Sequence, residues 1–501
     1  MKCGGVSSTV CRAANLVAMT LASGSSLSER LEAVERQARL LEESPEQRRA
    51  LGGAVLERAN EVVDGLDTRR AWTVGAGDRD GLLALGIPAE PAGLERALEL
   101  FDSEIDGPGL QPASGGHLGY IPGGGLFAGA LGDLLAAASN RYSGVHYAGP
   151  GAVHVENLCL RWLRDMVGMP AESHGTLTSG GSIATLVAVV AARDARGIGP
   201  KEIESSVVYS TRGAHHCVGK ALAIAGLGAT VQRHIDVDER FAMDAAALER
   251  QVAADRAAGL RPFLCIASAG TTDTGAIDPI RAMSDLCKAQ EMWLHVDGAY
   301  GGAFLLVNSM RALFDGIGEA DSVVVDPHKG LFLPYGSGAV LLRDPRHLAA
   351  SNGTRGAYLQ DVTDLADEPS PADLSPELTR HFRGLRMWLP LVLHGSNRVA
   401  SALEEKHLLA RYFQERATAM GFDLGPEPLL SVALFRWTKG TDDTDAFNRK
   451  LLQAVLDDGV VFLSSTTIDG HFWIRVAILS FRTHRDRVDH LLDLLARQVG
   501  A

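Results

Sequence analysis

Three features that could together perform chemistry stand where short apolar runs of the chain end. Lys329 and Asp297 each follow such a run, and Thr178-Ser-Gly-Gly-Ser182 stands between a strand-like dipeptide and a long helical pattern. A lysine amine can form a Schiff base with a carbonyl compound, a carboxylate can keep a pyridine nitrogen protonated, and a glycine-rich helix start can bind a phosphate through its free N–H groups. The three features together predict a site for pyridoxal 5′-phosphate, with Lys329 as its Schiff-base lysine.

Each feature also has an ordinary structural explanation. A lysine at a strand end can extend its ammonium group to solvent, an aspartate after a strand can cap a turn, and a glycine-rich turn can simply connect a strand to a helix. Their spacing favours the chemical interpretation. Lys329 lies 32 residues after Asp297, about one strand–helix–strand unit, so both side chains should reach the same edge of a sheet.

Two further polar residues follow predicted strands and should reach that same edge. His215 comes after the strand that ends at Tyr209, and Thr272 after the strand that ends at Ala267. His215 could lie flat on a cofactor ring and Thr272 could hydrogen-bond the ring oxygen, although a satisfied structural role is the default for either residue alone. The neighbouring His216 has no spaced partners, so we predict no metal site.

The elements that must position these residues are short, continuous apolar strands alternating with helical stretches between about residues 175 and 344. Continuous apolar strands indicate a sheet buried on both faces, which is typical of a mostly parallel α/β layer. The predicted strands are Ser206–Tyr209, Phe263–Ala267, Trp293–Val296, Val323–Val325 and Ala339–Leu342.

The chain on either side of this layer shows different patterns. Ser26 and Glu29 form a possible capping box for a helix whose apolar residues, Leu27 to Leu41, suit either packing within the chain or a dimer contact. After about residue 390 a smaller α/β unit is predicted, with strands at 430–437, 460–463 and 472–477 and helices at 444–457 and 485–498.

The composition favours a soluble enzyme that acts on small molecules. The chain has 501 residues, 46% hydrophobic and 22% charged, with a net charge of −13 that argues against a nucleic-acid partner. No window reaches the roughly 18 consecutive apolar residues of a membrane helix. The six cysteines are scattered without a C-x-x-C pair, and the residues before Ser26 only faintly resemble a signal peptide. We therefore predict a cytoplasmic protein.

Taken in order, the motifs resemble those of the group II pyridoxal-phosphate decarboxylases, which include aromatic-L-amino-acid, histidine and glutamate decarboxylases. The resemblance runs from about Gly116 to Arg482. It rests on the cradle at 178–182, Ala214-His215, Gly270-Thr-Thr272, His295-Val-Asp-Gly-Ala-Tyr300 and Asp326-Pro-His-Lys329.

The resemblance implies a fold-type I homodimer, like aspartate aminotransferase, with a mostly parallel seven-stranded sheet. Its parts would be an N-terminal dimer-wrapping helical segment (1–125), a large cofactor domain (126–389) and a small C-terminal α/β domain (390–501). The expected activity is decarboxylation of an L-amino acid to its amine and carbon dioxide.

The resemblance also implies a role for each matching residue. Lys329 would form the internal aldimine, Asp297 would pair with the pyridinium nitrogen, and Ala299 and His215 would pack on the two faces of the ring. Gly181, Ser182 and His328 would bind the phosphate, and Thr272 would orient the ring oxygen or the substrate carboxylate. Tyr358 matches a tyrosine of a loop contributed across the dimer, which protonates the quinonoid carbon. Tyr120 and Pro122 match a substrate-contact segment.

Departures from the family leave the substrate open. Aromatic-specific relatives carry bulky residues where this chain has Pro112 and Gly144, so the pocket is expected to be wider, or polar through Tyr142 and His146. Related plant enzymes that make aldehydes oxidatively carry phenylalanine in place of Tyr358, so its presence favours simple decarboxylation. The first rival is another fold-type I reaction, by an aminotransferase or a carbon–carbon lyase. The second rival is a non-catalytic pyridoxal-binding or scaffold protein. Asp326 is acidic where some relatives have asparagine, and the sequence gives no physical account of its effect.

Overall fold

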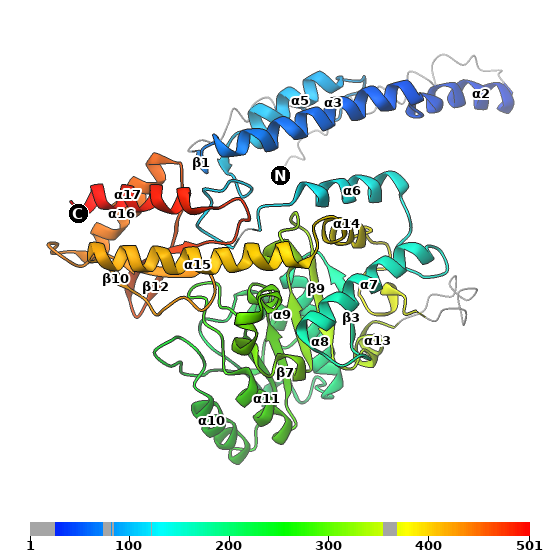
Figure 1. The fold of residues 1–501 in the computed structure, drawn as a ribbon. Coiled ribbons are helices and arrows are strands. Elements are labelled where there is room, and N and C mark those ends of the chain that lie inside the picture. Colours follow the sequence, from blue (N-terminus) through cyan, green and yellow to red (C-terminus); the bar gives the residue numbers. More distant parts are fainter. Residues whose placement is uncertain (1–25, 74–81, 83–84, 122, 354–367, 501) are drawn as a thin grey trace, which may run out of the picture. The chain divides into compact units, whose positions relative to one another are not determined.

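The computed structural model describes residues 26–73, 82, 85–121, 123–353 and 368–500. The chain divides into two compact units, Met1–Gln111 and Pro112–Ala501, which Figure 1 shows in sequence colours. Both sheets that matter for the site belong to the second unit. The predicted boundaries after residues 125 and 389 stay predictions.

The first unit is mainly helical. Ser26 and Glu29 form the predicted capping box, in which Ser26 N–H donates to Glu29 Oε2 (2.7 Å) and Glu29 N–H to Ser26 Oγ (3.3 Å). A second capping box, Ser44 with Gln47, starts a longer helix that was not predicted. The elements are α2 (Leu27–Ala38), a 3-10 turn (Arg39–Leu41), α3 (Pro45–Asp64), a 3-10 turn (Gly65–Asp67), β1 (Trp72–Thr73), α5 (Leu94–Leu100), a π-helical turn (Phe101–Asp106) and β2 (Gly109–Leu110).

The apolar residues of α2 are exposed in this structure. Leu27, Leu31 and Val34 are 82%, 64% and 49% exposed. Packing of these side chains within their own unit is therefore not observed among the described residues, and the dimer contact stays a prediction.

The second unit contains the predicted seven-stranded, mostly parallel sheet. Its strand order is β3-β9-β8-β7-β6-β4-β5, and only β9 runs antiparallel to its neighbours. The strands are β3 (His174–Thr178), β4 (Ser206–Ser210), β5 (Val231–His234), β6 (Arg261–Ser268), β7 (Trp293–Asp297), β8 (Ser322–Val325) and β9 (Gly338–Leu342). The predicted strands at 206–209, 263–267, 293–296, 323–325 and 339–342 all lie within them.

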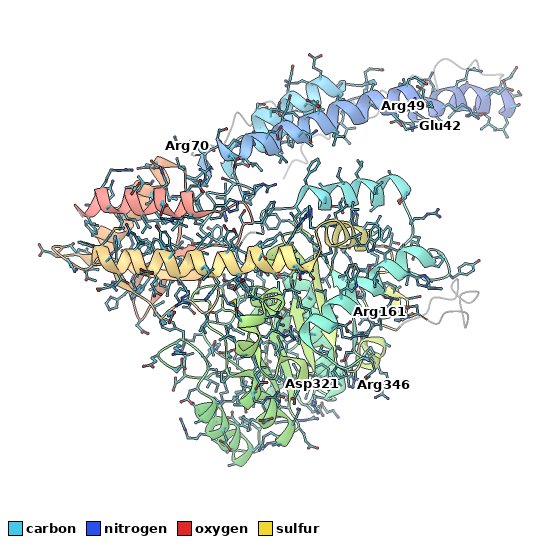
Figure 2. All side chains as sticks on the ribbon, viewed as in Figure 1. Glu42, Arg49, Arg70, Arg161, Asp321 and Arg346 are labelled. Carbon is cyan, nitrogen blue, oxygen red and sulfur yellow. The ribbon has the colours of Figure 1, made fainter. Side chains whose placement is uncertain are left out.

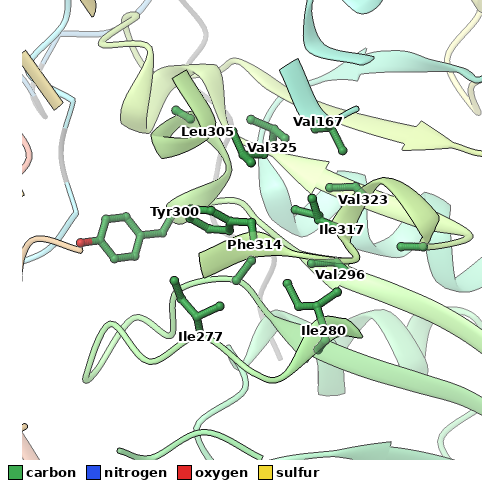
Figure 3. Close-up of a cluster of buried hydrophobic side chains, with 14 of the residues drawn as sticks. Val167, Ile277, Ile280, Val296, Tyr300, Leu305, Phe314, Ile317, Val323 and Val325 are labelled. Carbon is green, nitrogen blue, oxygen red and sulfur yellow. The ribbon is translucent and has the colours of Figure 1, made fainter. Parts of the chain in front are cut away.

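Helices cover both faces of this sheet because successive strand residues point to opposite faces. Val323 and Val325 pack in one buried cluster and Val324 in another. The first cluster is closed by helices α7 (Pro150–Val167), α10 (Ala245–Ala257) and α11 (Ile280–Ala289), and the second by α8 (Gly181–Ala195), α9 (Cys217–Ile224) and α13 (Arg346–Asn352). Figure 3 shows Val296, Val323 and Val325 together with Ile280 and Phe314 among the buried side chains of the first cluster.

A small antiparallel sheet follows toward the C-terminus, with strand order β10-β11-β13-β12. Its strands are β10 (Asp423–Leu424), β11 (Val432–Arg436), β12 (Ser464–Ile468) and β13 (His471–Ala477); the remaining helices of the unit are α6 (Phe127–Ser139), α12 (Pro327–Gly330), α14 (Gly384–His394), α15 (Ser396–Met420), α16 (Thr444–Asp458) and α17 (Arg485–Val499). Apolar residues of α15, α16 and α17 share one buried cluster with β11 and β13.

One predicted strand of this small unit is wrong. The apolar run at 460–463 is not a strand of the sheet; the strand is Ser464–Ile468, in which buried and exposed residues alternate. Phe462 instead pairs with an upstream segment, donating to Gly116 O (2.8 Å) and accepting from Leu118 N–H (2.9 Å). The apolar run at 460–463 is a buried connection, whereas the alternation of buried and exposed residues identifies the half-buried strand that follows it.

Candidate active site

A cavity of about 390 Å³ lies at the carboxyl ends of the parallel strands of the large sheet. This volume falls in the range of roughly 300–1,000 Å³ that small-molecule sites occupy. Asp321, which precedes β8, and Arg346, which follows the antiparallel β9, mark the opposite end of the sheet (Figure 2). The cavity is lined by Ser179, Gly180, Gly181, Ser182, Ile183, His215, Cys217, Ser268, Gly270, Thr271, Thr272, Asp297, Ala299, Tyr300, Asp326, His328, Lys329, Tyr335 and Gly336.

The cavity brings together every residue predicted to contact the cofactor. These residues come from the ends of five strands, which explains how positions up to 148 apart in sequence meet at one edge. They are Gly181, Ser182, His215, Thr272, Asp297, Ala299, His328 and Lys329.

Lys329 carries its amine into this cavity from the short helix α12. Its Nζ lies 3.1 Å from Asp326 Oδ2, and its side chain is 21% exposed. Burial alone would lower the pKa of Lys329, but the negative charges of Asp326 and Asp297 more than offset it, so the pKa is raised above its ordinary value. Lys329 is therefore held as an ammonium ion by two carboxylates.

The glycine-rich turn at 178–182 forms the start of helix α8. The Thr178 hydroxyl lies 3.1 Å from Gly180 O and 3.4 Å from Gly180 N, which fixes the turn and leaves the first N–H groups of α8 facing the cavity. A Cβ atom at Gly181 would lie 2.8 Å from Asp326 Oδ2 and 3.3 Å from Ala299 Cβ. Only glycine therefore lets a ligand approach this backbone, as a bound phosphate requires.

His328 stands beside this turn. Its Nδ1 lies 2.5 Å from Ser337 O, so that nitrogen carries the proton and donates it to the carbonyl. Burial lowers the pKa of His328. The ring is thereby held in one orientation with its other nitrogen 3.9 Å from Asp326 Oδ2.

Asp297 and His215 line the cavity from the ends of β7 and the loop after β4. Asp297 Oδ1 accepts a hydrogen bond from Ala299 N–H (3.1 Å), which fixes the carboxylate at the strand end. His215 Nδ1 accepts from Cys217 N–H (3.3 Å). Burial lowers the pKa of His215 despite the nearby Asp297, so the ring is neutral near pH 7 and can stack on a flat ligand.

Thr272 belongs to a loop that is held from two sides. The neighbouring Thr271 hydroxyl lies 2.7 Å from Thr274 Oγ1 and accepts from Ala276 N–H (3.0 Å). Arg475 of β13, only 2% exposed, donates to the main-chain oxygens of Thr272 and Asp273. Arg475 was not predicted, because a lone arginine in a strand pattern carries no signal of what it contacts.

The cavity lining does not include the described residues that were predicted to contact the substrate, Tyr120, Tyr142 and His146. Tyr120 is 55% exposed and packs against Phe462, with ring centroids 5.6 Å apart. Tyr142 donates to Leu378 O (3.3 Å), and His146 Nε2 lies 3.0 Å from His154 Nε2. Pro122 and Tyr358 lie outside the described residues.

The cavity also contains residues that the sequence did not mark as a site. Asp326 and Tyr335 lie on either side of Lys329 in the sequence. Tyr300 is the last residue of the motif at 295–300, in which only Asp297 and Ala299 were given a role. Cys217 and Ser268 also line the cavity. Burial raises the pKa of the Cys217 thiol to about 11, so this cysteine is not a nucleophile at neutral pH. For Asp326, its place in the Asp-Pro-His-Lys motif was the signal.

Comparison with known proteins decides the family. A family profile described as the pyridoxal-dependent decarboxylase conserved domain matches residues 116–437. An aromatic-L-amino-acid decarboxylase from Bacillus atrophaeus is 33% identical over 73% of this chain and 77% of its own length. The chain belongs to the pyridoxal-dependent decarboxylase family. An L-2,4-diaminobutyrate decarboxylase from Rhizobium meliloti (strain 1021) is 30% identical over 90% of this chain and 92% of its own length.

Solved structures agree with the fold of this decarboxylase. The Oryza sativa TDC with PLP and tryptamine superimposes with a TM-score of 0.85 at 24% identity, covering 91% of this chain and 98% of that one. Mouse CSAD in apo form gives a TM-score of 0.79 at 25% identity over 89% of this chain and 99% of that one. The fold is therefore fold-type I, as predicted.

Membership settles the cofactor and the class of reaction. The decarboxylase uses pyridoxal phosphate and is a carboxy-lyase that acts on an amino acid. The residues of the cavity fit this cofactor independently of the comparisons. The cavity brings together a phosphate cradle in which Gly181 leaves the backbone bare, a carboxylate at a strand end and a lysine amine. In the described part of the chain, no three His, Cys, Asp or Glu side chains are arranged to hold a metal ion.

Proposed function

We propose that Lys329 binds pyridoxal phosphate covalently and that the enzyme removes the α-carboxylate of an L-amino acid as carbon dioxide. The observation that carries the proposal is the convergence of the Lys329 amine, the Asp297 carboxylate and the Gly181 cradle on one cavity. Lys329 and His215, whose pKa values are shifted, share this cavity, and titratable groups with shifted pKa values in a cavity are typical of catalytic sites.

Each residue of the cavity has a separate role in this proposal. When bound, pyridoxal phosphate supplies an electron-poor ring that takes up the electron pair left by the departing carboxylate. Asp297 holds a proton on the ring nitrogen, while His215 and Ala299 pack on the two faces of the ring. Gly181, Ser182 and His328 bind the phosphate, and Thr272 orients the ring oxygen or the substrate carboxylate.

Tyr358 would return a proton to the substrate carbon after carbon dioxide has left. This role rests on the match of Gly356-Ala-Tyr-Leu359 to the family's loop, and a general acid in this position contributes typically 10²–10⁴-fold to the rate. A transaminase has no need of it.

We further propose a homodimer in the cytoplasm. Large apolar side chains of the second unit are exposed on α6 and α14, among them Leu135 (54%) and Leu393 (57%), and exposed apolar patches mark interaction surfaces. Tyr142, His146 and Tyr120 would then reach a substrate only across the dimer. The free, buried cysteines Cys159, Cys217, Cys265 and Cys287 suit a reducing compartment, and no described helix is long and apolar enough to cross a membrane.

The substrate is proposed only as an L-α-amino acid. Relatives named for aromatic amino acids and for L-2,4-diaminobutyrate match to similar degrees. The absence of bulky residues at Pro112 and Gly144 favours a wider or more polar pocket than in aromatic-specific enzymes.

The test is a screen of the amino acids with the purified holoenzyme. Carbon dioxide and the matching amine are expected in stoichiometric amounts, and Lys329→Ala should lose both while it keeps its folded thermal transition. Keto acid without carbon dioxide would show an aminotransferase and overturn the proposal. Lys220 is an exposed lysine of α9 and supplies the matched control, because Lys220→Ala should leave turnover unchanged.

A further inference from the structure

Asp326 occupies a position in which an aspartate usually caps a helix, yet it does not do so. It precedes α12 as the N-cap residue, but its side chain makes no capping hydrogen bond. The carboxylate turns instead into the cavity, where the residue is 2% exposed. The ordinary explanation for an aspartate at this place therefore does not apply.

The carboxylate of Asp326 lies between the phosphate cradle and the lysine. Its Oδ2 is 3.1 Å from Lys329 Nζ, and the positions that Cβ atoms would take at Gly181 and Gly338 lie 2.8 Å from Oδ2 and Oδ1. Oδ1 is buried and has no hydrogen-bond partner among the described residues. A buried oxygen without a hydrogen-bond partner lowers the stability of the fold, so its presence calls for an explanation.

The surroundings of Lys329 leave Asp326 as its direct ionic partner. Asp297 acts on the amine as a second negative charge without an ion pair within 4.0 Å among those found for the described residues. Among the described residues, the titratable groups that face Lys329 are Asp326 and His328 from its own segment, Asp297 from β7, His215 from the loop after β4, Cys217 from the start of α9, and Tyr335 from the loop after α12.

We propose that Asp326 is the counter-ion and proton acceptor of Lys329: its carboxylate holds the lysine as ammonium in the cofactor-free enzyme and takes one proton from it when Lys329 condenses with an aldehyde. This inference rests on the proposed role of Lys329. Asp326 acts through Lys329, so it is a positioning residue and a proton relay.

The condensation balances without a further reactant. Lys329–NH₃⁺ and the aldehyde O=CH–R give Lys329–NH⁺=CH–R and one water. Two protons leave the nitrogen and both depart with the former carbonyl oxygen. Asp326 takes the first proton, which frees the nitrogen lone pair to attack, and returns it to the oxygen as the carbon–oxygen bond breaks. Its position 3.1 Å from the nitrogen suits this transfer.

The test follows attachment of pyridoxal 5′-phosphate to the full-length chain stripped of its cofactor. The rate of the absorbance change is measured from about pH 6 to 12, because the pKa of Lys329 lies above its ordinary value, and the product is trapped with borohydride and located by peptide mass. For Asp326→Asn we expect the pH midpoint to fall by about 1–3 units, because an opposite charge at this distance raises a lysine pKa by that amount. The plateau rate should fall roughly 10²-fold with the relay lost.

Two controls separate this role from a structural one. Pyridoxine 5′-phosphate, which keeps the ring and the phosphate but has no aldehyde to condense with Lys329, should bind Asp326→Asn and wild type equally within about twofold. Asp315→Asn, which removes an exposed carboxylate paired with Arg281, should leave the midpoint unchanged. Asp326→Ser is the second variant and should shift the midpoint like Asp326→Asn.

An unchanged midpoint and plateau in both Asp326 variants would overturn the inference, as would a loss of pyridoxine phosphate binding equal to the loss of attachment. Failure of the proposed function looks different. In that case borohydride would trap no adduct on Lys329 in the wild-type chain itself.

Discussion

At the scale of the residue, Gly181 shows how closely the cavity is built around a bare backbone. A methyl group there would meet Asp326 Oδ2 at 2.8 Å, and both groups are confined. We expect Gly181→Ala to lower the free energy of unfolding by about 1–3 kcal/mol, the usual cost of overpacking, and to weaken pyridoxal phosphate binding at least about tenfold. Urea denaturation and cofactor titration measure the two effects.

Gly219 supplies the matched control. It lies exposed in helix α9, and a Cβ atom there meets nothing within 4 Å. Gly219→Ala should stabilise the protein by about 0.5–1 kcal/mol, because alanine loses less conformational freedom in a helix, and should leave cofactor affinity alone. Equal behaviour of the two variants would show that Gly181 is an ordinary helix residue.

Asp278 makes a second prediction at this scale, on the pH dependence of stability. Its carboxylate accepts from Met243 N–H (2.8 Å) and Ser268 N–H (2.7 Å), yet burial raises its pKa from 3.8 to about 6. The folded protein therefore binds this proton more tightly than the unfolded chain. The protonated carboxyl stabilises the fold below about pH 4, and this contribution is lost as the pH rises to about 6.

Asp278→Asn removes the titration. Between pH 4 and 7 the wild type should lose more stability than the variant, by an amount on the order of 2 kcal/mol, measured by urea denaturation at each pH. The variant can be less stable throughout, since an amide matches two N–H donors poorly; only the slope tests the prediction. Parallel slopes would refute it.

At the scale of the element, strand β3 owes its position to a buried ion pair. Arg380 lies 2.9 Å from Glu156 Oε1, and both side chains are fully buried. Glu156 also accepts from Leu177 N–H (3.2 Å), and Arg380 donates to Thr176 Oγ1 (3.2 Å). This network anchors the strand that runs directly into the phosphate cradle.

Breaking one half of this pair should be worse than removing both. Arg380→Met leaves the Glu156 charge buried without its partner and should cost about 3–5 kcal/mol, whereas Arg380→Met with Glu156→Met should recover most of that loss. Arg281→Met, which breaks exposed pairs with Asp315 and Glu319, should cost less than about 1 kcal/mol. Urea denaturation of the cofactor-free proteins decides, and a double variant no better than the single one would contradict the argument.

The elements also show what a sequence can and cannot reveal. The fully buried strands of the large sheet were predictable because burial on both faces leaves continuous apolar runs such as Val323–Val325. The edge strand β5, in which half-buried and exposed residues alternate, was not predicted. Strand β12 was missed because it is half-buried and alternating, while the apolar Phe462 serves a connection. Helix α3 was missed although Ser44 and Gln47 form the same capping box that revealed α2.

At the scale of the whole molecule, the predicted cofactor residues meet because parallel strands end at one edge of the sheet. The spacing of the motifs along the chain was enough to predict this topology. The pairing of Asp326 with Lys329 was not predictable in the same way. It depends on which rotamer a carboxylate adopts among Gly181, Gly338 and the lysine. The described residues predicted to contact the substrate, Tyr120, Tyr142 and His146, do not line the cavity, which is why the proposed function invokes a second copy.

That requirement gives the last prediction. If the cavity with Lys329 is completed by Tyr358 of a second copy, Lys329→Ala and Tyr358→Phe subunits should complement each other. Each homodimer lacks one essential group in both sites, but the mixed dimer has one site that combines an intact Lys329 with an intact Tyr358. Refolding the two variants together at equal amounts should therefore restore decarboxylation to about a quarter of the wild-type rate, since half of the dimers are mixed and half of their sites are complete. Amine formation is the measurement, and light scattering reports the dimer. Activity of the mixture equal to the mean of the two variants would show that Tyr358 acts within its own chain.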